Sequence, residues 1–252
     1  MPEYIFKRNE VYFGDTIEVM STFPDKCIDF IFADLPFSTT KCPWDSPIDL
    51  TKLWEQYERI IKDNGCIALF AQTPFDKVLG ASNLSLLRYE WIWEKVKATG
   101  HYNAKKMPMK AHENILIYYR NLPTYNPQKT TGHKPVNSFT KKVNVANKTR
   151  VYGEGNKDIV GGGNTDRYPR DTLKFSSDTQ KMKGTEFVHD TQKPILLAEY
   201  FVKTYTNEGD LVLDNVSGSG TTGLACKNLN RDFLMIENDE AFYNMSKRRV
   251  GM

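Results

Sequence analysis

Short apolar runs alternate with amphipathic stretches along the first 120 residues of the chain. Runs rich in Ile, Val, Phe and Leu predict strands at residues 10–13, 28–33, 66–71, 89–96 and 114–119. Apolar side chains recur at helical spacing from Leu50 to Ile61, and a second helix is predicted from Pro74 to about Leu87. Strands that alternate with helices are typical of an α/β fold with helices packed on the faces of a sheet.

Apolar periodicity is nearly absent from Asn121 to Phe187. This segment is rich in Asn, Thr, Lys and Gly, so we expect a long functional insert with no packed core of its own. After it, the pattern predicts helices at residues 195–204, 221–229 and 241–249 and strands at 211–213 and 233–236. The predicted architecture is one Rossmann-like α/β domain, a mostly parallel twisted sheet with helices on both faces. Its two halves are residues 1–120 and 188–252, and residues 121–187 are inserted between them.

The composition is that of a globular protein. Of the 252 residues, 40% are hydrophobic and 26% are charged, which excludes wholesale disorder. No apolar run reaches bilayer length and the first ten residues are charged, so we expect a cytoplasmic protein with no membrane partner. The four cysteines lie far apart without histidines at metal-ligand spacing, so we expect reduced thiols and no structural zinc.

Positive charge is concentrated in the predicted insert. Residues 121–187 hold 12 Lys and Arg against 6 Asp and Glu, whereas the rest of the chain holds 22 against 25. A near-neutral body with a basic insert suits a polyanionic partner, although a solvated basic loop would give the same pattern.

A glycine-rich turn follows the predicted strand at residues 211–213. Asp214 ends the strand, and Gly218, Gly220 and Gly223 form a G-x-G-x-x-G pattern at the start of a helix. Glycines let the backbone approach a ligand closely, and a helix start offers free N–H groups. Glu237, 19 positions after Gly218, follows the next strand and could accept hydrogen bonds from both ribose hydroxyls.

The alternative for this motif is a glycine turn that binds no ligand. An NAD site is disfavoured because little chain follows Glu237 to hold a second nucleotide, so a mononucleoside ligand is expected.

A second polar turn follows the strand at residues 28–33. Pro36 restricts Leu35 to an extended conformation that can direct its carbonyl outward, while Asp34 offers an acceptor and Phe37 a ring face. A carboxylate, a carbonyl and a ring together suit a planar amine. Taken alone, the turn is explained as well by a strand end with Asp34 as a cap and Phe37 in the core.

The two turns together resemble the DNA amino-methyltransferases that depend on S-adenosylmethionine. These enzymes methylate adenine N6 or cytosine N4, and their Asp-Pro-Pro-Tyr motif resembles Asp34-Leu35-Pro36-Phe37, with Leu35 in place of the first proline. The catalytic turn precedes the glycine turn and the basic insert lies between them, an order that resembles the beta group of the family. Gly14-Asp15 and Thr191-Gln192-Lys193-Pro194 also resemble family segments.

The resemblance implies a role for each matching residue. The catalytic residues would be Asp34, Leu35, Pro36 and Phe37, with the amine held by Asp34 and the Leu35 carbonyl and the flipped base stacked on Phe37. The residues that would bind S-adenosylmethionine are Asp15, Asp34, Lys193, Asp214, Gly218, Ser219, Gly220, Thr221 and Glu237. The insert would be the target-recognition region, with DNA contacts from Lys141, Lys142, Lys148, Arg150, Arg167 and Arg170.

The leading hypothesis is therefore a site-specific adenine-N6 methyltransferase that acts on double-stranded DNA. Cytosine N4 is the close alternative, because the same turn serves both amines. A DNA-binding relative without activity and an enzyme that acts on RNA or a free nucleoside are further alternatives. Members of the family accompany a restriction endonuclease or act alone, and many form homodimers; the sequence leaves both questions open.

Overall fold

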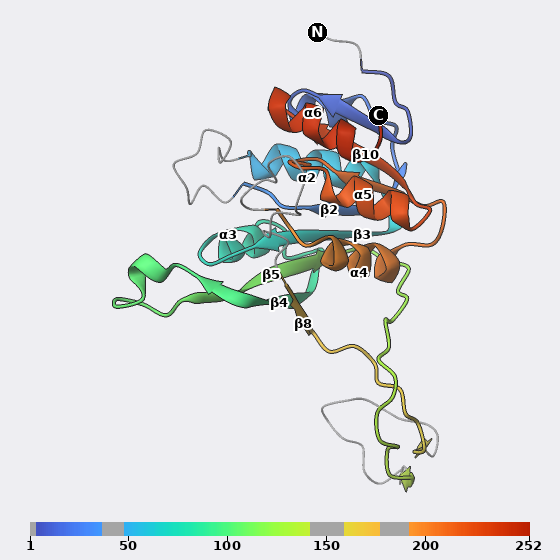
Figure 1. Ribbon diagram of the computed structural model, residues 1–252. Helices are drawn as coiled ribbons and strands as arrows, with labels where there is room; N and C mark the ends of the chain where they lie inside the picture. Colours follow the sequence, from blue (N-terminus) through green and yellow to red (C-terminus); the bar gives the residue numbers. More distant parts are fainter. Residues whose placement is uncertain (1–3, 37–47, 142–158, 177–191) are drawn as a thin grey trace. The chain divides into compact units, whose positions relative to one another are not determined.

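A computed structural model describes residues 4–36, 48–141, 159–176 and 192–252 (Figure 1). The chain divides into two compact units, one made of Met1–Asn126 with Asp171–Met252 and the other of Pro127–Arg170. We describe each unit by itself.

The larger unit is built on an eight-stranded sheet in the order β1-β10-β9-β2-β3-β5-β4-β8. Seven of these strands run in one direction and β5 runs in the other. In sheet order, the strands are Glu10–Phe13, Asp232–Glu237, Leu211–Asp214, Ile28–Ala33, Ile61–Ala71, Lys110–Tyr118, Leu87–Thr99 and Thr172–Phe175. The parallel strands have their carboxyl ends at one edge, which is where ligands bind in open α/β sheets.

Helices cover both faces of this sheet. The first face packs against α1 (Thr16–Ser21), α2 (Leu50–Ile60) and α3 (Phe75–Ser82). The second face packs against α4 (Ile195–Tyr205), α5 (Thr221–Asn228) and α6 (Glu240–Arg249). The fold is thus the predicted Rossmann-like arrangement.

The alternation of side chains along the strands explains why there are two cores. In β2, Ile31 and Ala33 join the first core, whereas Phe30 and Phe32 join the second. Both sets are fully buried, so the strand is apolar at almost every position, as expected for a parallel strand covered on both faces.

The structure corrects several of the sequence predictions. The strand predicted at residues 66–71 begins at Ile61, and the strand predicted at 114–119 begins at Lys110. The helix predicted from Pro74 to Leu87 ends at Ser82, because Asn83 leaves the helical region at φ −149° and ψ 69°. The short helix α1 was not predicted. β8 comes from the segment in which no core was expected, yet it pairs with β4 and accepts a hydrogen bond from Trp93 Nε1 at the Phe175 carbonyl.

The smaller unit contains two short antiparallel strands, β6 (Phe139–Lys141) and β7 (Ile159–Gly161). Thr130 bridges to Arg167 through the backbone, and Lys129 pairs with Asp166 at 2.8 Å. In the described ranges of the whole chain, no helix is both long and apolar enough to cross a membrane. Cys66 and Cys226 are buried, and Cys27 is partly exposed.

Candidate active site

Three predicted acidic residues lie at the same edge of the sheet. Asp34 follows β2, Asp214 ends β9 and Glu237 ends β10. These strands are neighbours in the order β10-β9-β2 and run parallel, so their carboxyl ends meet. Residues that are 203 positions apart in sequence are therefore brought together by the sheet alone.

Asp34 has one oxygen engaged and one open. Its Oδ2 accepts a hydrogen bond from Lys193 Nζ. Its Oδ1 is buried and has no hydrogen-bond partner among the residues that the structure describes. Burial raises the pKa of Asp34, with Lys193 opposing the rise and the negative charge of Glu113 adding to it. Asp34 can therefore accept a further hydrogen bond at Oδ1 while Lys193 occupies Oδ2.

The turn after Asp34 is anchored by Leu35, whose side chain is 2% exposed and belongs to the first core. This burial replaces some of the rigidity that a proline would give at that position, so the backbone leaves β2 in a fixed direction. Phe37, predicted to stack on a base, lies outside the described residues.

A chain of alternating charges extends from Asp34 into β4 and β5. Lys193 Nζ lies 3.3 Å from Glu113 Oε2, and Glu113 Oε1 lies 2.5 Å from Lys95 Nζ. The side chains of Lys95 and Glu113 are each 9% exposed. Burial favours the neutral form of Glu113, yet Lys193 and Lys95 hold its pKa below the usual value. Lys193 also lies 4.9 Å from the centre of the Phe70 ring.

Sequence reasoning missed part of this network. Lys193 was placed near the cofactor, but no role was given to Lys95, and Glu113 was not counted among the site residues. The available signal was Glu113 at the start of an apolar run, because a charged residue seldom enters a buried strand without a partner.

The glycine turn is fastened to Glu237. Gly218 has φ +48° and donates its N–H to Glu237 Oε2 at 2.7 Å. Glu237 Oε1 accepts from the N–H groups of Asn238 and Asp239 at 2.9 and 3.0 Å. A Cβ added to Gly218 would meet no atom within 4 Å, so there is open space directly beside the turn.

The other two glycines serve packing. Gly220 has φ +76°, and a Cβ there would lie 2.8 Å from the Ser246 Cβ of α6. A Cβ on Gly223 would lie 2.6 Å from the Met235 side chain of β10. The pattern thus has one glycine beside open space and two that allow helix α5 to pack closely.

The hydroxyl groups of the turn are held from α6. Arg249 Nη1 donates to Ser219 Oγ and Thr221 Oγ1, both at 3.0 Å, a contact that the sequence did not reveal. Ser217 Oγ is buried and makes no hydrogen bond within the part of the chain that the structure describes.

Asp214 stabilises the turn from inside. It accepts hydrogen bonds from Thr222 Oγ1 at 2.6 Å and from the Val216 N–H at 3.3 Å. Burial raises its pKa to about 7. The side chain is 6% exposed, so its observed contacts are internal to the turn.

Asp15 caps helix α1. Its Oδ1 accepts from the N–H groups of Ile17 and Glu18 at 2.9 and 3.1 Å. The preceding Gly14 N–H donates to the Glu237 carbonyl at 3.0 Å, which places Asp15 next to the end of β10. Its role in cofactor binding stays a prediction.

Few of the predicted DNA-binding residues have described side chains. Lys142, Lys148 and Arg150 lie outside the described residues, and Lys141 ends β6. In the smaller unit, Arg167 donates to the carbonyls of Lys134 and Asn164 at 2.6 and 3.0 Å, and Arg170 is exposed.

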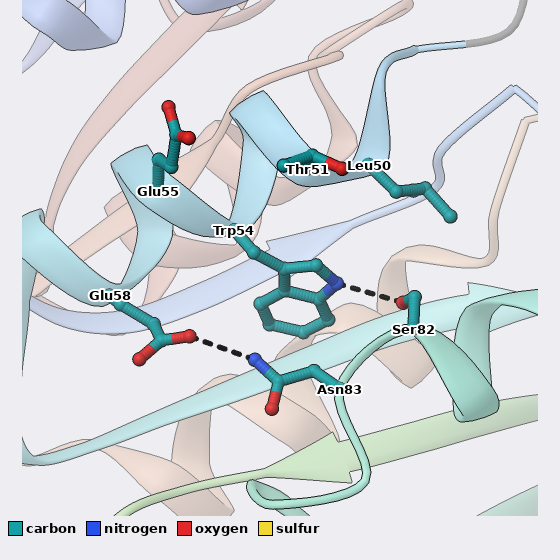
Figure 2. A pocket seen from close by; sticks show the side chains of 7 residues that line it. All are labelled: Leu50, Thr51, Trp54, Glu55, Glu58, Ser82 and Asn83. Atoms are coloured by element: carbon teal, nitrogen blue, oxygen red, sulfur yellow. Dashed lines mark hydrogen bonds between the residues drawn. The ribbon is translucent and has the colours of Figure 1, made fainter.

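A separate hollow lies between α2 and the end of α3 (Figure 2). Two internal hydrogen bonds cross it, from Trp54 Nε1 to Ser82 Oγ at 2.8 Å and from Asn83 Nδ2 to Glu58 Oε1 at 2.9 Å. It contains none of the predicted site residues. The residues that line it are Leu50, Thr51, Trp54, Glu55, Glu58, Ser82 and Asn83.

Comparison with known proteins finds relatives in sequence and in fold. The chain is 26% identical over 269 residues to the Type II methyltransferase M2.MboI of Moraxella bovis, covering 96% of this chain and 88% of that protein. Its fold is similar to that of M1.HpyAVI in complex with SAM, with a TM-score of 0.64, 23% identity and coverage of 96% and 99% of the two chains. It is also similar to the cytosine-N4-specific PvuII DNA methyltransferase, with a TM-score of 0.68, 16% identity and coverage of 96% and 86%.

A family model described as DNA methylase matches residues 28–248, a span that includes both turns and the segment between them. This match confirms the resemblance on which the motifs were first interpreted. The chain belongs to the DNA methylase family.

Proposed function

We propose that this chain is a site-specific methyltransferase that transfers a methyl group from S-adenosylmethionine to adenine N6 in double-stranded DNA. The observation that carries the proposal is the Asp34 carboxylate, whose Oδ1 atom is buried without a partner among the described residues and whose Oδ2 accepts a hydrogen bond from Lys193. An acceptor in this state suits an amine that must lose its planar geometry in order to react.

The exocyclic amine of a base is a poor nucleophile because its lone pair is delocalised into the ring. Asp34 Oδ1 would accept one amine N–H and the Leu35 carbonyl the other, which favours the pyramidal form and stabilises the positive charge that develops on nitrogen. The demethylated cofactor, S-adenosylhomocysteine, would be the leaving group, and the excess proton on nitrogen would pass to solvent after transfer. No covalent intermediate with the protein is required. Because Lys193 stays on Oδ2, Asp34 would remain ionised while Oδ1 is engaged.

The residues of the glycine turn fit a nucleoside cofactor. Ser217 Oγ is a buried polar atom without a described partner, and the open space beside Gly218 adjoins the Glu237 carboxylate. From the residues that the structure describes, Glu237 Oε2 accepts one hydrogen bond, so it has capacity for a ribose hydroxyl. S-adenosylmethionine supplies a methyl group activated by a positively charged sulfur, and the turn would orient it toward Asp34.

The target base must leave the duplex to reach Asp34. Flipping costs a few kcal/mol, and stacking on Phe37 would offset part of that cost. Segment 121–187 would read the target sequence, with Lys141, Lys142, Lys148, Arg150, Arg167 and Arg170 as candidate contacts. Its nine Asn and Gln residues suit contacts with adenine edges in the major groove of the recognition sequence.

The direct test is to identify the product. Purified protein is incubated with labelled S-adenosylmethionine and mixed-sequence duplex DNA, and the DNA is digested to nucleosides for mass spectrometry. The proposal expects N6-methyladenine. N4-methylcytosine would keep the mechanism and change the base, and transfer to RNA alone would contradict DNA as the substrate.

A further inference from the structure

The connection between β4 and β5 carries positive charge only. From Val96 to Ala111 there are four lysines and no acidic residue. The rest of the chain outside residues 121–187 holds 18 Lys and Arg against 25 Asp and Glu. This connection is therefore a basic arm on an otherwise acidic body, and it lies outside the segment in which the sequence analysis placed DNA binding.

The side chains of this arm are almost all directed to solvent. Every residue from Thr99 to His112 is exposed, and Tyr102 in the short helix η1 (His101–Asn103) is 101% exposed. Lys110 donates to Gln72 Oε1 at 2.8 Å. Among the described residues, no hydrogen bond or ion pair holds Lys97, Lys105 or Lys106. Tyr102 thus contributes nothing to the core and is available, together with the lysines around it, for contact with a partner.

The arm projects from the sheet edge at which Asp34 lies. β4 runs parallel to β3 and β2, so all three strands end at this edge (Figure 1). Beyond the paired residues Glu94 and His112, the hairpin continues to η1. At about 3.3 Å per residue it reaches about 15 Å outward from the sheet.

The base of the arm is part of the active-site network. Lys95 on β4 is joined to Glu113 on β5, and Glu113 is joined through Lys193 to Asp34. These ion pairs connect the base of the arm to the catalytic carboxylate. A duplex that delivers a base to Asp34 must therefore pass close to the exposed lysines.

We infer that residues 96–111 form a second DNA-contacting element, which binds the phosphate backbone beside the flipped base. Lys97, Lys105 and Lys106 neutralise phosphates, and Tyr102 contacts the sugar-phosphate chain at the end of the arm. The inference rests on the proposed function only in taking duplex DNA as the substrate. It does not depend on which base is methylated or on the target-recognition segment.

The test removes the three unpaired lysines together, as K97Q/K105Q/K106Q. A matched control, K7Q/K26Q/K203Q, removes the same charge from residues that precede β1, β2 and β9, at the opposite edge of the sheet. Duplex affinity is measured against salt concentration for both proteins and for the unmodified chain, and S-adenosylmethionine affinity is measured as a check of folding.

The arm variant should bind duplex DNA about tenfold to a hundredfold more weakly near 0.1 M salt, and its log–log salt slope should fall by about 2 to 3. The control should change both quantities much less. A benzophenone amino acid at position 102 should cross-link to duplex DNA. Equal effects of the two triple variants on the salt slope would overturn the inference.

The two proposals fail in distinguishable ways. If the product is N4-methylcytosine, the salt slopes still decide the role of the arm. If the arm variant binds duplex DNA like the control, the mass of the methylated nucleoside still decides the function.

Discussion

Two carboxylates and two ammonium groups share the space around the reacting position. Asp34, Lys193, Glu113 and Lys95 alternate in sign, so the cluster as a whole is neutral although it is largely buried. Each charge offsets the desolvation of its neighbour, which is the condition under which buried ionised groups persist. The arrangement raises the pKa of Asp34 through burial, while Lys193 opposes that rise from one of its two oxygens.

The role of Lys193 can be tested through pH. Because Lys193 lowers and burial raises the pKa of Asp34, Lys193→Met should raise that pKa further. Methyl transfer needs ionised Asp34, so the acidic limb of the pH–rate profile should move to higher pH. Single-turnover rates at saturating cofactor measure this shift, with Lys203→Met as a control. An unchanged limb would mean that Lys193 does not act on Asp34.

Asp214 should make the stability of the protein depend on pH. Its folded-state pKa of about 7 lies above the ordinary value of 3.8, so the native state binds the proton more tightly than the unfolded state. The associated stability is complete below the ordinary pKa and is lost as pH rises through about 7. Asp214→Asn should remove this dependence.

Urea unfolding of the wild type and of Asp214→Asn at about pH 5 and about pH 8 tests this prediction. The other titratable groups contribute equally to the pH dependence of the two proteins, so the difference between them reports Asp214. Between these values the wild type should lose about 2–3 kcal/mol more unfolding free energy than Asp214→Asn. Equal pH dependence in the two proteins would show that Asp214 is solvated in solution.

At the scale of elements, helix α5 and its glycine turn combine two requirements. Gly218 faces open space at the end of the sheet, whereas Gly220 and Gly223 bring α5 against α6 and β10. The same short motif thus serves ligand access and packing, and the two uses fall on different residues.

Alanine substitutions should separate these uses. Gly218→Ala should cost about 1 kcal/mol of stability from its positive φ, yet weaken S-adenosylmethionine binding about tenfold or more, because the methyl group enters the open space. Gly220→Ala should cost about 2–4 kcal/mol through strain and the clash with Ser246. Thermal unfolding and cofactor titration measure both; a reversed order of effects would contradict these assignments.

The sequence predicted the elements that carry strong apolar patterns. β1 and β2 have the predicted bounds. Asp34, Asp214 and Glu237 lie together because each follows or ends a parallel strand, and the carboxyl ends of parallel strands lie at one edge of the sheet. β8 escaped prediction because its stability comes from pairing with β4, a partner distant in sequence. The contacts of Glu113 and Arg249 depend on tertiary packing, which one-dimensional periodicity does not report.

At the scale of the whole molecule, the chain separates into a body and an inserted unit. All eight strands of the main sheet and both cores belong to the body, and Pro127–Arg170 has its own internal hydrogen bonds. The body should therefore fold without the insert.

Replacing Pro127–Arg170 by a flexible Gly/Ser linker of about a dozen residues tests this division. The shortened protein should bind S-adenosylmethionine as the full chain does and should keep affinity for duplex DNA through the basic arm. It should lose preference among DNA sequences, as measured by competition between duplexes. Retained sequence preference would place target recognition in the body.

The central claim is that Asp34 accepts a hydrogen bond from the amine that is methylated. Single-turnover methyl transfer to duplex DNA by Asp34→Ala tests it most directly, with cofactor affinity measured on the same protein. The account predicts a fall of about a thousandfold in the transfer rate with cofactor affinity changed only a few-fold. Transfer near the wild-type rate would contradict it.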